Sequence, residues 1–185
     1  MRLRTLLSAG AAAALLAACS NESLLPRSTV ANVVDTITLG ALRSTPVGVA
    51  SAYSLFLSAP VRTDLSSSYD FLYDIDPVLG PALYPAQATG VFSPATTNPG
   101  LQRMTVAFDS ITQARSNGYI LDEPLAIDSG DVFLARSPIV CNIGVPQYGK
   151  LQILGIDSVA HTVTFQIMVN NNCGYRGLQP GLPSN

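Results

Sequence analysis

The chain has 185 residues but no tryptophan, one histidine, three cysteines and only 12% charged residues. Without tryptophan a sugar-binding platform is not favoured, although seven tyrosines leave one open. The ten basic residues form no cluster, so a phosphate-backbone partner such as nucleic acid is not expected.

The signatures of common active sites are missing as well. The chain contains no G-x-S-x-G or S-x-x-K nucleophile motif, no H-E-x-x-H metal motif and no glycine-rich phosphate loop. Heptads, solenoid periods and low-complexity tracts are also absent from the sequence. We therefore expect no cofactor, no bound metal and no catalytic residue, and a binding or structural role rather than an enzymatic one.

The first nineteen residues carry the clearest signal. Arg2 and Arg4 make the N-terminal region positively charged, and an uncharged, mostly apolar run of thirteen residues follows from Leu6 to Ala18. A helix that spans a bilayer needs about 20 apolar residues, so this run fits an export signal better than a permanent anchor. Small residues then precede Cys19.

The sequence Leu16-Ala17-Ala18-Cys19 resembles the lipobox of bacterial lipoproteins, and the resemblance covers residues 1–19 only. It implies that residues 1–18 are a signal peptide, that cleavage precedes Cys19, and that this cysteine carries diacylglycerol and fatty acyl chains such as palmitate. The alternative is an ordinary secretory signal with a cysteine at an A-x-A-type cleavage site.

The resemblance also indicates a location. In lipoproteins of the Gram-negative type, Asp after the lipidated cysteine favours retention in the inner membrane, whereas this chain has Ser20. We therefore expect a lipid-anchored envelope protein of the outer membrane. Residues 19–28 would be a tether with a typical reach of about 15–20 Å, and the mature chain would carry a net charge of −4. An envelope protein is a possible partner, and the oligomeric state stays open.

After lipidation of Cys19, Cys141 and Cys173 remain as an even pair in a compartment where disulfides persist, which predicts one bridge. Two free thiols and a metal site are the alternatives. A zinc site needs four ligands of the His or Cys type, and the chain adds only His161.

Short strands separated by turns dominate residues 29–185. Alternation is clearest over Tyr69–Asp76 and over Thr162–Asn170, and Leu151–Ile156 is expected to form a hairpin with the latter across Asp157–His161. A second hairpin is expected between Leu125–Ile127 and Val132–Ala135.

Weaker strands are predicted at Val33–Leu39, Val49–Leu57, Met104–Phe108 and Tyr119–Leu121. The spacing of Phe108, Ile111 and Ala114 fits a helical turn or a loop. With no convincing amphipathic helix, the pattern predicts an all-β fold: a single antiparallel β-sandwich or a partly open β-barrel.

Asp128-Ser129-Gly130 resembles the D-[ST]-G loop of aspartic proteases, and Ile153–Asp157 resembles a second element of the retroviral type. That resemblance implies a hydrolase with Asp128 as one of two carboxylates that share a proton. However, only 22 residues separate Gly130 from Ile153, which is too few for the flap and strands of such proteases. A tight turn between strands is the favoured interpretation.

Three further groups of residues can be interpreted either as structural or as functional. Asp70, Asp74 and Asp76 could contribute to a Ca²⁺ site, but a solvated strand face is favoured. His161 is expected to be a solvated turn residue. The last group could be a partner surface near the predicted disulfide or packing around it, and comprises Tyr148, Tyr175 and Arg176.

Overall fold

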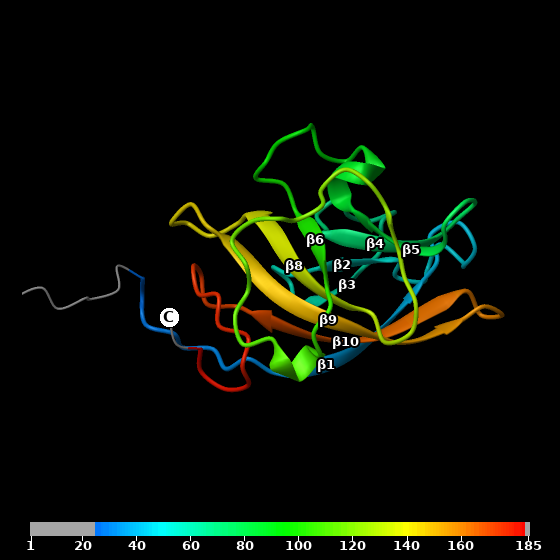
Figure 1. Ribbon diagram of the computed structural model, residues 1–185. Helices are drawn as coiled ribbons and strands as arrows, with labels where there is room; N and C mark the ends of the chain where they lie inside the picture. Colours follow the sequence, from blue (N-terminus) through cyan, green and yellow to red (C-terminus); the bar gives the residue numbers. More distant parts are fainter. Residues whose placement is uncertain (1–24, 184–185) are drawn as a thin grey trace, which may run out of the picture.

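The computed structural model describes residues 25–183, which fold into two antiparallel five-stranded sheets packed as a β-sandwich (Figure 1). The first sheet has the strand order β1 (Val34–Gly40), β10 (Thr162–Asn170), β9 (Pro146–Asp157), β8 (Val132–Ile139) and β6 (Gly100–Met104). The second has the order β3 (Ala59–Val61), β2 (Ala52–Ser54), β4 (Phe71–Asp76), β5 (Gly80–Pro85) and β7 (Leu125–Ala126). The expected all-β fold is confirmed, in its sandwich form.

The core lies between the sheets and follows the alternation of the strands. Phe71 and Tyr73 of β4 and Phe165 of β10 point inward and are fully buried. Tyr53 of β2 stacks on Phe71 with ring centres 5.7 Å apart, and its ring meets that of Phe165 edge-on at 6.0 Å. These rings pack the two sheets against each other.

Irregular segments cover part of both outer faces as well. Over the first sheet, the 3-10 helix η2 (Phe108–Ser110) and the C-terminal segment cover the outward residues Leu134 and Met168. Over the second sheet, Leu72 packs against Ala86 of the 3-10 helix η1 (Ala86–Thr89). Outward positions of the strands are therefore often buried, which simple alternation does not predict.

The hairpin of β9 and β10 is confirmed. Counting outward from Ile156 opposite Thr162 predicts that Tyr148 faces Asn170, and it does. Close to the turn, however, Ile156 faces Val163, and a β-bulge at Leu154 corrects the register by one residue. Asp157 caps the turn by accepting the amide hydrogens of the second and third residues after it, and His161 closes the turn at φ 55°.

The expected hairpin of Leu125–Ile127 with Val132–Ala135 is wrong. β7 pairs with β5 in the second sheet, whereas β8 pairs with β6 and β9 in the first. Residues 128–131 are therefore a crossover between the sheets. The turn residues fit a crossover as well as a hairpin, so composition cannot distinguish the two.

Of the weaker strands, Val33–Leu39 corresponds to β1. The others are shorter or displaced: Val49–Leu57 contains only β2, Met104–Phe108 overlaps β6 and η2, and Tyr119–Leu121 contributes one isolated bridge, between Ile120 and Leu101. β3 and β5 are not among the predicted strands, and both contain proline, which is uncommon within strands. The predicted helical turn is η2, whose Phe108 lies in one cluster with Ile111 and Ala114.

Candidate functional site

The N-terminal segment is fixed to one end of the sandwich, where β10 and the C-terminal segment emerge (Figure 1). The buried Asn172 side chain accepts the amide hydrogens of Thr29 and Val30 at 2.8 and 3.0 Å and donates to the Val30 carbonyl at 2.7 Å. Tyr175 donates its hydroxyl hydrogen to the Pro26 carbonyl at 2.8 Å. We call this arrangement of Asn172 and Tyr175 with residues 26–30 the N-terminal clamp.

The clamp includes residues that the sequence places in the tether. Of residues 26–28, Pro26 accepts a hydrogen bond from Tyr175. The lipidation residue Cys19, the signal peptide 1–18 and tether residues 20–24 lie outside the described part of the chain.

The predicted disulfide lies at the same end of the molecule. Cys141, in the loop between β8 and β9, forms a disulfide with Cys173, and their Cα atoms are 5.7 Å apart. Cys173 follows the end of β10 by three residues, as the hairpin register predicts. The bridge connects the β8–β9 loop to the segment that contains the clamp.

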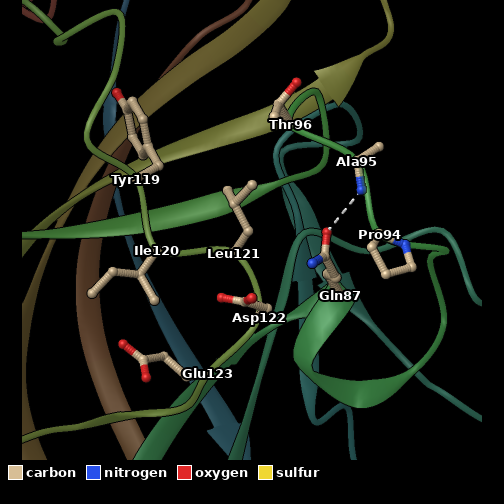
Figure 2. Close-up of a pocket in the computed structure, with 9 residues that line it drawn as sticks. All are labelled: Gln87, Pro94, Ala95, Thr96, Tyr119, Ile120, Leu121, Asp122 and Glu123. Carbon is tan, nitrogen blue, oxygen red and sulfur yellow. Dashed lines mark hydrogen bonds between the residues drawn. The ribbon is translucent and has the colours of Figure 1, made fainter.

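An open groove of about 570 Å³ lies between the loop after β5 and residues 119–123 (Figure 2). Arg136 connects its two walls, because its guanidinium donates to the Thr96 carbonyl at 2.7 Å and lies 5.1 Å from the Tyr119 ring centre. Gln87 stabilises the loop by accepting hydrogen bonds from Ala95 and Asn98. The volume suits a small ligand, but the charged groups beside it are the exposed carboxylates of Asp122 and Glu123 and the guanidinium of Arg136, which already bonds within the protein, and these define no ligand.

The acidic strand face is not solvated as expected, because Asp70 and Asp74 are both buried. Asp74 accepts a hydrogen bond from the Arg43 guanidinium, with Nε 2.5 Å from Oδ2. Asp76 caps the β4–β5 turn and accepts the Tyr84 hydroxyl hydrogen at 2.6 Å. Burial, followed by this hydrogen bond, raises the pKa of Tyr84 to about 12.

Asp70 has a separate environment. Its carboxylate accepts the Leu55 amide hydrogen at 2.5 Å and is only 4% exposed. Burial raises the pKa of Asp70 to about 7, and the hydrogen bond from Leu55 opposes that rise. Each of the three acids thus has its own bonding partners, which explains them without a shared ligand.

The two protease-like fragments do lie together in space. Ser129 donates its hydroxyl hydrogen to the Leu154 carbonyl at 3.1 Å, and the Gly130 amide donates to the Ile153 carbonyl at 2.8 Å. Within the turn, the Asp131 carboxylate accepts the Asp128 amide hydrogen at 2.7 Å and pairs with Arg103 at 2.5 Å. The Asp128 side chain itself is exposed. These contacts support the tight-turn interpretation.

The tyrosines near the disulfide are packing residues rather than exposed anchors. Tyr148 and Tyr175 are each 7% exposed, and the Tyr148 ring lies 6.4 Å from that of Tyr119. Arg176 is half-buried, and its carbonyl accepts the Ala114 amide hydrogen. His161 is a turn residue as expected, but it is half-buried and its backbone carbonyl accepts the Ala41 amide hydrogen.

Sequence reasoning missed Lys150, which is the single lysine of the chain and is only 2% exposed. Its ammonium group donates to the carbonyls of Phe108 and Ile111, both at 2.9 Å, and lies 4.4 Å from the Phe108 ring centre. Burial lowers the pKa of Lys150. Its place on the outward face of β9 gave no sign of burial, because η2 covers it from a distant part of the sequence.

Among residues 25–183, no three His, Cys, Asp or Glu side chains converge as a metal site would require. The same part of the chain has no helix of the length and hydropathy needed to cross a bilayer. Comparisons with protein-family models, with curated proteins and with solved structures find no match.

Proposed function

We propose that this chain is a lipid-anchored protein of the bacterial cell envelope, located at the outer membrane, with a non-enzymatic binding or structural role. The observation that carries the proposal is the lipobox-like sequence Leu16-Ala17-Ala18-Cys19 after a charged start and an apolar run. Stable membrane attachment needs two lipid signals, and a diacylated cysteine with an added acyl chain meets that need.

Two structural features support the proposal. The chain is fixed to the sandwich from Pro26 onward, which leaves a short segment after Cys19 as a tether. The disulfide of Cys141 and Cys173 is a cross-link that persists in exported proteins. A non-enzymatic role is favoured because the Asp128 side chain is exposed in a turn, and the neighbouring Asp131 carboxylate is paired with Arg103 instead of sharing a proton with Asp128.

Lipidation is tested by expressing the full chain in a bacterial host that is fed an alkyne-bearing palmitate analogue. The expected product begins at Cys19, carries diacylglycerol and an acyl chain in its intact mass, and reacts through the alkyne. Cys19→Ala should abolish labelling and leave uncleaved precursor, whereas Ser23→Ala should behave as the wild type. A mature terminus at another residue, or an unmodified Cys19, would contradict the proposal.

A further inference from the structure

The end of the sandwich that holds the N-terminal clamp carries exposed apolar side chains in two loops. Phe56 and Leu57, in the turn between β2 and β3, are 59% and 56% exposed. Ile139 and Ile143, at the end of β8 and in the loop that follows, are 50% and 47% exposed. We call these four residues the apolar tip.

Contacts place both loops around the point where the tether leaves the domain. Ser58 donates its hydroxyl hydrogen to the Asn171 side chain at 3.1 Å, which brings the β2–β3 turn to the end of β10. Ile143 and Leu25 both pack over Gly174, where the chain adopts φ +84° and a Cβ atom would meet their side chains. Ile143 therefore lies beside the first residue that the structure describes.

The charge distribution at this end is also distinct. The chain contains twelve acidic residues, and none lies in the four segments that build this end, which are 25–33, 55–58, 139–146 and 171–183. The charged side chains of these segments are Arg27 and Arg176. No carboxylate in them would have to leave water, or be repelled by anionic headgroups, if this end met a membrane.

The opposite end of the sandwich differs, although it too exposes apolar side chains. Val78 is 88% exposed and Val159 is 89% exposed, each in a hairpin turn. The Asp76 and Asp157 carboxylates cap these turns. The turns at the opposite end thus carry acids of their own, whereas the segments of the clamp end contain none; the nearest acids there are the buried Asp70, bonded to the Leu55 amide, and Asp35, which lines a pocket with Ser58.

We propose that the apolar tip inserts into the surface of the lipid bilayer to which the chain is anchored; this rests on the proposed lipidation of Cys19. The six peptide units that join Cys19 to Leu25 span at most about 20 Å when extended. A domain of this size is about 40 Å across, as judged from its expected radius of gyration of about 15 Å. So short a tether keeps the clamp end next to the membrane, and the tip residues then leave water at little further entropic cost.

The absence of tryptophan makes the inference directly measurable, because one introduced indole is the only one in the chain. The full-length lipidated protein is reconstituted into vesicles of phosphatidylethanolamine and phosphatidylglycerol, as Phe56→Trp, Ile143→Trp or the matched control Val159→Trp. When the protein is moved from detergent into vesicles, the tryptophan fluorescence of Phe56→Trp and of Ile143→Trp should shift to shorter wavelength. Lipids brominated on the acyl chains should quench it. Val159→Trp emission should keep its position and intensity.

Flotation of the same samples separates the two proposals. Protein that floats with the vesicles but shows no shift and no quenching at positions 56 and 143 overturns the inserted tip and leaves the anchor intact. Protein that does not float overturns the anchor and the inserted tip together. Phe56 and Ile143 lie in different loops. If the melting curve of one variant shows that it has misfolded, the other variant still tests whether the tip is inserted.

Discussion

Asn172 pairs with Val30 as a neighbouring β-strand would, with the side-chain oxygen accepting the Val30 amide hydrogen at 3.0 Å and the side-chain nitrogen donating to the Val30 carbonyl at 2.7 Å. The same oxygen accepts the Thr29 amide hydrogen. One buried side chain thereby satisfies three backbone groups of a segment that is 142 residues away in sequence.

Asn172→Ala should release this segment. It removes the three hydrogen bonds to this segment and a fourth to the Asn170 side chain, so we expect a loss of about 1–3 kcal/mol of stability, together with faster hydrogen exchange at the Thr29 and Val30 amides. Asn172→Asp keeps an acceptor for both amides but sets a carboxylate oxygen against the Val30 carbonyl and the Asn170 side-chain oxygen, so it should also lower stability and protection. Unchanged exchange in Asn172→Ala would contradict the clamp.

The disulfide of Cys141 and Cys173 closes a loop between residues 32 apart. Loop-closure entropy for such a loop corresponds to roughly 3–4 kcal/mol of stability. Reduction, or the double variant Cys141→Ala with Cys173→Ala, should lower the melting temperature by about 10 °C. Equal melting temperatures with and without reductant would contradict a stabilising bridge.

Much of the fold follows from the sequence because its best signals are local. Tyr69–Asp76 and Thr162–Asn170 alternate strongly, and both contain strands of the sandwich. Even the far end of the β9–β10 pairing follows from the turn, since the bulge at Leu154 restores the register that simple counting gives. At the bulge, the Leu154 carbonyl accepts a hydrogen bond from Ser129, which lies in a distant turn of the chain.

The errors arise where tertiary contacts override alternation. Asp74 and Lys150 occupy outward positions that predict solvent, yet Arg43 pairs with the first and η2 covers the second. Likewise, nothing local distinguishes the crossover at Asp128 from a hairpin. The disulfide could be predicted by counting cysteines, whereas the clamp at Asn172 joins the two ends of the domain and has no sequence signature.

Asp70 should make stability depend on pH. Its pKa in the folded chain, about 7, lies above the unfolded value of about 3.9, so the folded state favours the protonated form. Protonated Asp70 therefore contributes its full stabilisation below about pH 4. As the pH rises through 7 this contribution is lost, and the free energy of unfolding falls by up to about a few kcal/mol. Urea unfolding between pH 4 and pH 8 should show this fall in the wild type and a smaller one in Asp70→Asn, whose amide oxygen can still accept the Leu55 hydrogen bond. Parallel pH profiles would contradict the raised pKa.

The Lys150 side chain should be protected from reagents in solution, and its hydrogen bonds should be needed for the stability of the fold. Lys150→Met leaves the Phe108 and Ile111 carbonyls without their donor, and we expect a loss of about 2–4 kcal/mol. Arg115→Met, at an exposed position, should change stability by no more than about 0.5 kcal/mol. In the native wild type, an amine-reactive reagent should modify Lys150 only as fast as the fold opens, and adding urea should accelerate labelling. Rapid labelling of the native chain would contradict the burial.

The proposed outer-membrane location predicts that Ser20 controls sorting. If acylated Cys19 is followed by a residue that permits release from the inner membrane, wild-type protein should fractionate with outer-membrane vesicles on a density gradient. Ser20→Asp introduces the carboxylate that favours inner-membrane retention and should move the protein to the inner-membrane fraction, whereas the uncharged Ser20→Asn should move less of it. All three chains should carry the same lipid mass, because the change follows the cysteine and leaves the apolar run intact. Wild-type protein found in the inner-membrane fraction would contradict the location while leaving the lipid anchor in place.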